Sequence, residues 1–135
     1  MNVLVDTSVW SLALRRVEAR DDSFSRELAD LVREGRVVML GPIRQELLSG
    51  VRSDKQFTTV RDHLRAFPDQ EITTSDYESA AGLFNRCRRR GIRGSNIDFL
   101  ICAVGARLGT PVLTTDGDFK AFAKVLPIRL HKPRG

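Results

Sequence analysis

Residues 2–10, with the sequence NVLVDTSVW, decide the first unit of the fold. The short apolar run within them is rich in β-branched residues and predicts a buried strand that ends at Asp6. Residues 8–16 read SVWSLALRR and predict a helix. A buried strand that passes directly into a helix is the repeating unit of α/β domains, so this stretch favours that class.

The same alternation continues along the chain. RVVML at 36–40 and PVLTT at 111–115 predict two further strands, and PIRLH at 127–131 predicts an edge strand. Apolar periodicity, caps and stop signals predict helices at 24–32, 41–50, 53–66, 75–87, 95–109 and 118–125. Strands that alternate with helices predict an α/β fold, arranged as an α/β/α sandwich around a mostly parallel central sheet.

Two helix starts carry capping signals. Ser75 and Glu78 have the spacing of a capping box, and Tyr77 is expected on the buried face of that helix. Ser95 is a candidate cap for the next helix, and Asp98 then lies in its first turn. The second cap therefore predicts where Asp98 lies on its helix as well as where that helix begins.

Size and composition predict one compact domain. The chain has 135 residues, of which 41% are apolar, so a single core over residues 1–135 is expected. No apolar run approaches the roughly 18 residues of a membrane helix, and the N-terminus lacks signal-peptide features, so we expect a soluble, cytoplasmic protein. Cys87 and Cys102 fall at apolar helical positions, which favours reduced core cysteines over a disulfide or metal ligands.

The chain is basic, with a net charge of +5 and a pI near 9.9. This balance favours contact with polyanions such as nucleic acid, although a basic surface also serves solubility. The densest cluster comprises Arg86, Arg88, Arg89, Arg90 and Arg93. Arginine pairs bidentately with phosphate, so these residues are candidates for RNA binding; the alternative is a solvated helix end.

Carboxylates follow the predicted strands. Asp6 ends the first strand, Glu46 lies just beyond the second, and Asp116 and Asp118 follow the third. Asp98 reaches the same edge if its helix packs with its N-terminus toward it. Ligands bind beyond the carboxyl ends of parallel strands, so the set predicts a site there. Taken singly, each acid has a structural alternative as a helix cap, a turn residue or a solvated side chain.

The cost of such a cluster indicates its purpose. Two carboxylates about 4 Å apart repel by roughly 4 kcal/mol at an effective dielectric constant near 20, so a cation must enter or a proton must stay. The candidates offer only oxygen ligands, which suit Mg²⁺ or Mn²⁺ better than zinc.

Four segments together resemble a known family. LVDTSVW, GPIRQELLSG, NIDFLICAVG and VLTTDGDF are similar, in order and spacing, to the four acidic motifs of PIN-domain ribonucleases, and to the VapC toxin group in particular. The resemblance covers essentially the whole chain. It departs at Cys102, where alanine is common, and in GIRGSN before Asp98, which is unusually basic and glycine-rich.

The resemblance implies specific roles. Asp6, Glu46, Asp98 and Asp116 correspond to the catalytic quartet; the metal ligands implied are Asp6, Asp98, Asp116 and Asp118, and Thr7 or Ser8 would support them. It implies an Mg²⁺- or Mn²⁺-dependent endoribonuclease toxin with tRNA or ribosomal RNA as substrate, a cognate VapB-like antitoxin as inhibitor, and a homodimer.

General chemistry agrees with this expectation. A metal ion held by Asp6, Asp98 and Asp116 would activate water, while Glu46 holds a second ion or accepts a proton. In-line attack would leave a 5′-phosphate and a 3′-hydroxyl. A metal-free ribonuclease would need paired acid–base groups, and His63 and His131 do not fall in these motifs.

Other readings remain open. An aspartyl phosphotransferase would want a second aspartate where Ser8 stands. A non-catalytic RNA-binding or assembly module with a PIN-like fold is the main alternative, although such a module has no reason to keep a complete set of repelling acids. Trp10 is expected in the core or at a dimer contact and not as a platform for a nucleobase.

Overall fold

A parallel sheet of three short strands forms the centre of the structure, a computed structural model that describes residues 1–15 and 22–135. The strands are β1 (Val3–Val5), β2 (Val37–Val38) and β3 (Val112–Leu113), in the order β2-β1-β3. β1 pairs in parallel with both neighbours. The predicted parallel α/β fold is therefore confirmed.

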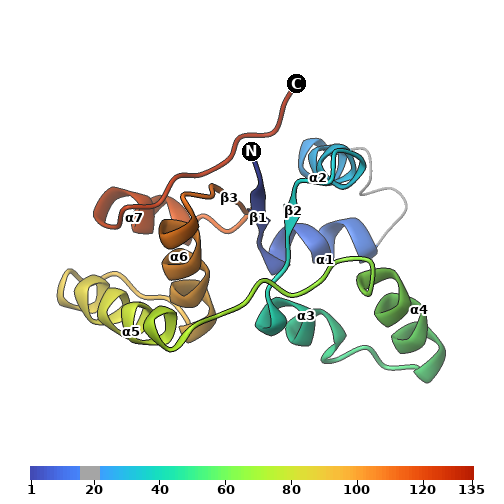
Figure 1. The fold of residues 1–135 in the computed structure, drawn as a ribbon, viewed down its shortest axis with the longest axis horizontal. Helices are drawn as coiled ribbons and strands as arrows, with labels where there is room; N and C mark the ends of the chain where they lie inside the picture. Colours follow the sequence, from blue (N-terminus) through green and yellow to red (C-terminus); the bar gives the residue numbers. More distant parts are fainter. Residues whose placement is uncertain (16–21) are drawn as a thin grey trace.

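Seven helices flank this sheet in the described residues. They are α1 (Thr7–Arg15), α2 (Ser23–Arg33), α3 (Gly41–Leu48), α4 (Asp54–Leu64), α5 (Thr74–Arg89), α6 (Asn96–Leu108) and α7 (Asp118–Val125). In Figure 1, α5, α6 and α7 lie on the β3 side of the strands, whereas α1, α2 and α4 lie on the β2 side. The last residue of the first predicted helix, Arg16, lies outside the described residues.

The strands run in one direction, so the segments that leave them meet at one edge. β1 passes into α1 at Asp6, β2 passes into α3 after Leu40, and β3 leads through a four-residue connection, 114–117, into α7. This is the edge at which the sequence predicts the acidic site.

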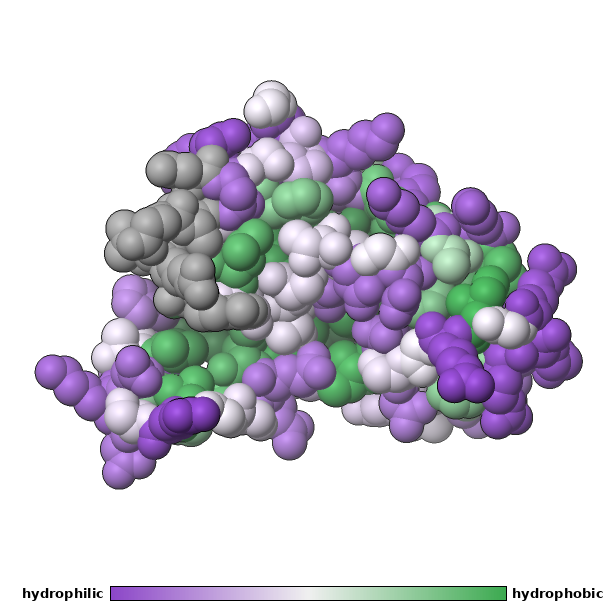
Figure 2. Space-filling view, turned by 180° about the vertical axis from the view of Figure 1, so that it is seen from behind, coloured by the Kyte–Doolittle hydropathy of each residue, from purple (hydrophilic) through white to green (hydrophobic). Residues whose placement is uncertain are grey.

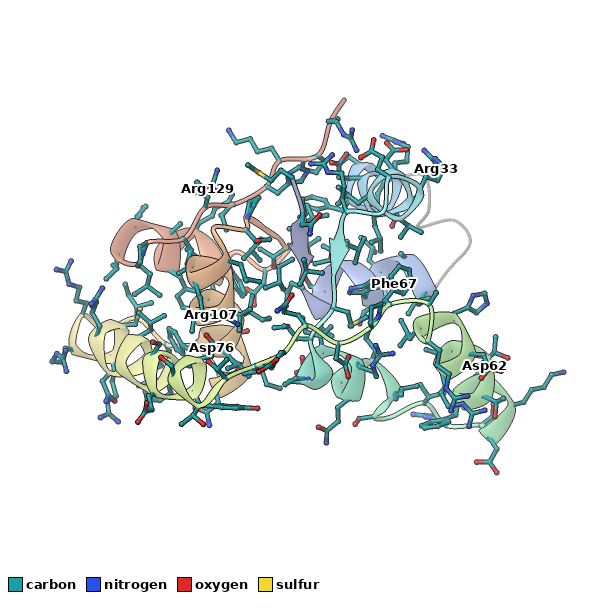
Figure 3. The ribbon with its side chains drawn as sticks, viewed as in Figure 1. Arg33, Asp62, Phe67, Asp76, Arg107 and Arg129 are labelled. Atoms are coloured by element: carbon teal, nitrogen blue, oxygen red, sulfur yellow. The ribbon has the colours of Figure 1, made fainter. Side chains whose placement is uncertain are left out.

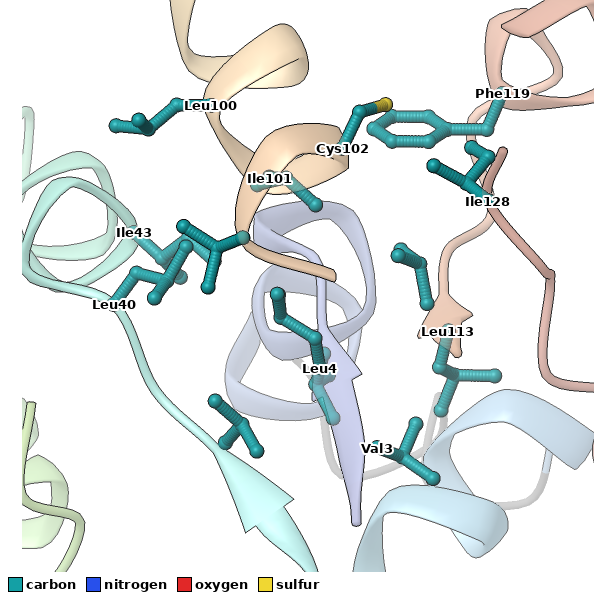
Figure 4. Packing of buried hydrophobic residues seen from close by; sticks show 14 of the residues in the cluster. Val3, Leu4, Leu40, Ile43, Leu100, Ile101, Cys102, Leu113, Phe119 and Ile128 are labelled. Atoms are coloured by element: carbon teal, nitrogen blue, oxygen red, sulfur yellow. The ribbon is translucent and has the colours of Figure 1, made fainter. Parts of the chain in front are cut away.

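The core explains why the first strand carries no polar alternation. Val3, Leu4 and Val5 are all 0% exposed, because the sheet is covered on both sides. Figure 4 shows Leu4 and Leu113 beneath Ile101, with Cys102 beside Phe119. Burial of each such side chain contributes about 1.5–3 kcal/mol, so the packing of α6 on the sheet is a main source of stability.

Both cysteines are free and buried, as expected. Burial raises the pKa of the Cys102 thiol far above its ordinary value, and nearby negative charge on Asp98 acts in the same direction. Burial also raises the pKa of Cys87, against the opposing effect of Arg86 and Arg90. Trp10 is a core residue as well, with its ring edge-on to Phe67 at a centroid distance of 5.1 Å.

The prediction for the start of α5 is wrong by two residues. Thr73 caps the helix and forms the capping box with Asp76, in place of Ser75 and Glu78. Asp76 is buried and accepts two hydrogen bonds from Arg107 on α6, at 2.7 and 2.8 Å, and the two side chains lie together in Figure 3. α5 therefore begins two residues earlier than predicted, with its capping residue Asp76 also bonded to α6, and Tyr77 is 55% exposed, contrary to expectation.

The predicted edge strand at 127–131 contacts the sheet at one position only. Leu130 forms a parallel bridge with Val112, supported by hydrogen bonds from Val112 N to Arg129 O and from His131 N to Val112 O. Pro127 has no backbone N–H, and Ile128 N donates to Leu126 O, so a longer ladder does not form.

The residues after this bridge return to α2. Glu27 of α2 is 1% exposed, and its carboxylate meets His131 Nε2 at 2.6 Å and accepts from the backbone and guanidinium of Arg134. Arg134 also pairs with exposed Glu34. Burial acts to raise the pKa of Glu27, but these hydrogen bonds outweigh it and lower the pKa. The C-terminal segment is thus fixed by a buried charge.

Among the described residues, the helices are too short or too polar to cross a membrane.

Candidate active site

Asp6 is the most constrained acid at the predicted edge. It is 6% exposed, and its Oδ2 accepts hydrogen bonds from Ser8 Oγ at 2.8 Å and from Thr114 Oγ1 at 2.7 Å. Ser8 belongs to the first turn of α1, and Thr114 directly follows β3. Within the described residues no hydrogen bond reaches Oδ1, so one oxygen is fixed and the other is available.

Backbone amides orient the two hydroxyl groups. Thr115 N donates to Ser8 Oγ, and Asp116 N donates to Thr114 Oγ1, each at 3.0 Å. The hydroxyls also lie 3.2 Å from each other, but a hydroxyl has one proton and the carboxylate is the stronger acceptor. Both protons therefore point to Asp6, which the loop after β3 holds in place.

Asp116 and Asp118 have different roles at the start of α7. Oδ1 of Asp116 accepts from Asp118 N at 2.9 Å, and Asp116 O accepts from Phe119 N. Asp118 is the first residue of the helix and is exposed, so the alternative in which Asp118 caps α7 is wrong. The N-cap position belongs to Gly117, which has no side chain, and Asp116 precedes it, half-buried, with its carboxylate on the first amide of the helix.

Glu46 is exposed on α3, where Pro42 occupies the first turn. Its Oε1 accepts from Thr7 Oγ1 at 2.6 Å. The sequence left open whether Thr7 or Ser8 supports the site. In the structure both contact an acid: Thr7 holds Glu46 and Ser8 holds Asp6.

Asp98 lies in the first turn of α6 and forms the expected capping box with Ser95. Partial burial raises its pKa, and the negative charges of Asp6 and Asp116 act in the same direction, against the lowering effect of the Ser95 hydrogen bonds. The charges of Asp6 and Asp116 thus lie within electrostatic reach of Asp98, although the three residues come from three separate segments.

The donor set fits a hard divalent cation in its chemistry. All candidates are carboxylates, and Asp6 and Glu46 each keep one oxygen without a hydrogen bond in the described structure. However, within residues 1–15 and 22–135, no three His, Cys, Asp or Glu side chains converge as a finished ligand set. Local hydrogen bonds hold one oxygen of each carboxylate in the quartet of Asp6, Glu46, Asp98 and Asp116, so their convergence on one ion would require side-chain movement.

Sequence reasoning missed Thr114. The available signal was a hydroxyl residue immediately beyond an apolar strand and two positions before an acid, in VLTTD. Its contact with Asp6 depends on the pairing of β1 with β3, which the motif alone does not reveal.

The arginine cluster lies beside this site in the chain and is free of ion pairs in the described structure. Arg86, Arg88, Arg89, Arg90 and Arg93 are all exposed, and Arg88 lies over the Phe84 ring at 5.6 Å. Hydrophilic side chains cover the end of α5 at the right margin of Figure 2. Residues 90–95 then return to α6, where a side chain on Gly94 would meet Phe122 Cζ at 2.6 Å.

Hollows adjoin α3 on more than one side. One of about 420 Å³ lies beside Arg44, Leu48 and Phe57 and shares Gln45 and Ser49 with the hollow described next. One of about 430 Å³ is next to the acids and is lined by Thr7, Pro42, Gln45, Glu46, Ser49 and Ile97. A larger one, about 930 Å³, lies between α1, α3 and α4, with Leu14, Leu47 and Val60 among its apolar residues. No acid of the candidate site lines the larger hollow or the one of about 420 Å³, so the hollow that contains Glu46 is the relevant neighbour.

Comparisons with known proteins agree with the fold and the acidic motifs. The PIN domain family matches residues 3–125. A VapC ribonuclease of Mycobacterium bovis and ribonuclease VapC11 of Mycobacterium tuberculosis are each 32% identical over 128 residues, which cover 91% of this chain and 92% of theirs.

Solved structures support the same architecture. VapBC2 from Rickettsia felis, bound to a promoter DNA fragment, has a TM-score of 0.77 at 17% identity and covers 97% of this chain and 98% of its own. FitAcB from Neisseria gonorrhoeae has a TM-score of 0.69 at 21% identity and covers 97% of both chains. At these identities the structures establish the fold alone. From the family match and the curated relatives, the chain belongs to the PIN-domain family, in its VapC group.

Proposed function

We propose that this protein is a metal-dependent endoribonuclease toxin. The observation that carries the proposal is the fixed carboxylate of Asp6, held by Ser8 and Thr114 within the electrostatic reach of Asp98 and Asp116. The curated relatives are named as ribonucleases, which supports RNA as the substrate.

Asp6, Asp98 and Asp116 would hold Mg²⁺ or Mn²⁺, and exposed Asp118 would contribute directly or through water. When bound, the ion would stabilise charge on the phosphate and lower the pKa of an attacking water. Rotation of Asp98 would give up its hydrogen bond with Ser95, and neutralisation of the mutual repulsion would offset that loss.

The chain's own groups would perform the remaining steps. Ser8 and Thr114 keep Asp6 in one orientation. Glu46, whose Oε1 is held by Thr7, would accept the proton of the attacking water at Oε2. Attack on phosphorus in line with the ribose O3′ breaks the P–O3′ bond and leaves a 5′-phosphate and a 3′-hydroxyl.

The proposed partners follow from charge and from relatives. The exposed arginine cluster would bind phosphates of a tRNA or ribosomal RNA. Structural neighbours are VapBC assemblies, one of them described as a member of a toxin–antitoxin family, so a VapB-like antitoxin is the proposed inhibitor. A homodimer in the cytoplasm is the proposed working form.

Cleavage of a 5′-labelled tRNA and ribosomal RNA pool tests the activity. Purified protein is compared in Mg²⁺, Mn²⁺ and EDTA, beside Asp6→Asn and the control Asp54→Asn, which removes an exposed charge from α4. We expect discrete metal-dependent cuts with 3′-hydroxyl ends that disappear only in Asp6→Asn. Cuts that survive EDTA or end in cyclic phosphate would contradict the mechanism.

Thermal unfolding tests the metal without relying on activity. Mg²⁺ or Mn²⁺ should raise the melting temperature, because an ion that binds only the folded state stabilises it. Asp98→Asn keeps an oxygen acceptor for Ser95 N and removes a repelling charge, so it should stabilise the metal-free protein and weaken the response to the ion. An identical response in wild type and Asp98→Asn would favour the non-catalytic alternative.

A further inference from the structure

The hollow of about 430 Å³ beside Glu46 is lined by Glu46 and Thr7 of the proposed reaction and by four residues to which that reaction gives no role: Pro42, Gln45, Ser49 and Ile97. α3 supplies Pro42, Gln45 and Glu46, and Ser49 follows at its end. The start of α1 and the first turn of α6 close the other sides. Its volume falls within the usual range of small-molecule sites, and any group inside it would adjoin the reacting carboxylates.

The polar groups of this hollow are mostly hydrogen-bond acceptors. Ser49 Oγ donates its single proton to Gln45 O at 2.8 Å, so only lone pairs remain for a ligand. Glu46 has Oε2 left over after Oε1 accepts from Thr7. The side-chain amide of Gln45 is exposed and makes no hydrogen bond in the described part of the chain, so it is an uncommitted side-chain donor at this hollow, although Gln45 also lines the neighbouring hollow of about 420 Å³.

The remaining walls are apolar. Pro42 and Ile97 are half-buried and bring a ring and a branched side chain to the hollow from α3 and α6. A planar ligand could pack against them while its edge meets Gln45. RNA-binding sites read single-stranded bases in this way, by contact with the base face and hydrogen bonds to its edge.

We infer that this hollow binds the base of a nucleotide that flanks the cleaved phosphate, and that Gln45 reads its edge. The inference rests on the proposed ribonuclease function. Adenine, cytosine and guanine each carry an exocyclic amino group that can donate to Ser49 Oγ or Gln45 Oε1. Uracil offers two carbonyl acceptors and one N–H, so it matches this acceptor-rich hollow less well.

Binding of mononucleotides tests the inference without cleavage. ¹⁵N-labelled protein is titrated with AMP, CMP, GMP and UMP in the absence of metal, and the Gln45 side-chain amide is followed by NMR. We expect saturable shifts of Gln45, with at least one amino-bearing nucleotide bound about tenfold more tightly than UMP. Gln45→Ala should abolish that difference. The control Gln56→Ala removes the same amide from α4, beside the larger hollow, and should leave it intact.

Cleavage gives the second readout. Wild type, Gln45→Ala and Gln56→Ala cut a short RNA with randomised positions, and the nucleotides on both sides of the cuts are sequenced. Uracil should be depleted at one flanking position in wild type, and Gln45→Ala should reduce that depletion about tenfold with an unchanged melting temperature.

The outcomes separate the two claims. The base site is overturned if Gln45→Ala cleaves RNA with unchanged nucleotide frequencies beside the cuts, or if all four nucleotides shift the Gln45 amide equally. Neither result contradicts the nuclease. If none of the three proteins cleaves RNA but the wild type still shows nucleotide-selective NMR shifts at Gln45, the result supports the base site and counts against the nuclease. Shifts that map to the larger hollow also overturn the inference.

Discussion

The hydroxyl of Thr114 donates to Oδ2 of Asp6 over 2.7 Å, although 108 positions separate the two residues in the chain. The contact exists because β1 and β3 are neighbours in the sheet. It joins the first acid to the loop that carries Asp116, whose own N–H donates to the same hydroxyl.

Thr114→Val should therefore lower activity while the fold is retained. Valine preserves the shape of threonine but supplies no proton to Asp6 and no acceptor for Asp116 N. Loss of such an orienting group typically costs 10- to 100-fold in activity or metal affinity, and about 1 kcal/mol in stability. The measurement is kcat on a cleaved RNA together with the metal titration. Thr115→Val is the matched control, since its side chain is exposed, and equal losses in both variants would exclude an orienting role.

Glu27→Gln should destabilise the protein near neutral pH by about 2 kcal/mol, the usual contribution of a charged hydrogen bond. The folded-state pKa of Glu27 is lowered, so its stabilisation is complete above the ordinary glutamate pKa of about 4.3 and is lost as pH falls through the folded value. Urea unfolding at pH 7 and at lower pH should show the difference between wild type and variant shrinking with acid. Glu34→Gln, which removes the exposed acceptor of Arg134, should change little.

Gly94→Ala should cost about 1–3 kcal/mol, because the new Cβ would lie 2.6 Å from Phe122 Cζ in a ring cluster that is 0–1% exposed. The displaced turn also carries Ser95, so activity should fall with stability. Gly82→Ala is the opposite control: its Cβ meets no atom within 4 Å inside α5, and the change should stabilise by up to about 1 kcal/mol. An unchanged melting temperature in Gly94→Ala would show that the phenylalanine rings move aside to accommodate the new Cβ.

The arginine cluster can be tested by salt dependence. Arg89→Gln combined with Arg90→Gln should weaken RNA binding and reduce the slope of log K against log salt by about 1.4, or 0.7 for each lost phosphate contact on a single strand. Arg61→Gln with Arg65→Gln removes the same charge from α4, where both arginines contact Asp62. If fluorescence anisotropy shows the same reduction in the salt slope for both double variants, RNA binding depends on net charge and not on the arginine cluster.

Cys87 and Cys102 should resist a thiol reagent in the native protein. Both are 0% exposed, and burial raises both pKa values, so the reactive thiolate is scarce and inaccessible. Labelling should follow global unfolding and rise steeply with denaturant. Rapid labelling of either cysteine without denaturant would reveal local opening of α5 or α6.

Local sequence signals were sufficient for most of the architecture. The apolar run of β1, the helix α3 after the second strand, and the cap of α6 at Ser95 are encoded by residues a few positions apart, and each is present as expected. The positions of Asp6, Glu46, Asp98 and Asp116 along their elements followed from the same signals. A hydrophobic period or a cap is satisfied within one or two turns, so neighbouring residues suffice to specify it.

The tertiary structure decided what depends on distant residues. Arg107 donates to Asp76 across 31 positions, and Thr7 donates to Glu46 across 39. The hollow beside Glu46 exists only because α1, α3 and α6 meet. Such contacts form when packing brings separate segments within hydrogen-bond distance, and no local pattern encodes that distance. The sequence by itself determined which helices and strands form and where the acidic residues lie along them. Packing determined which hydroxyl group donates to which acid.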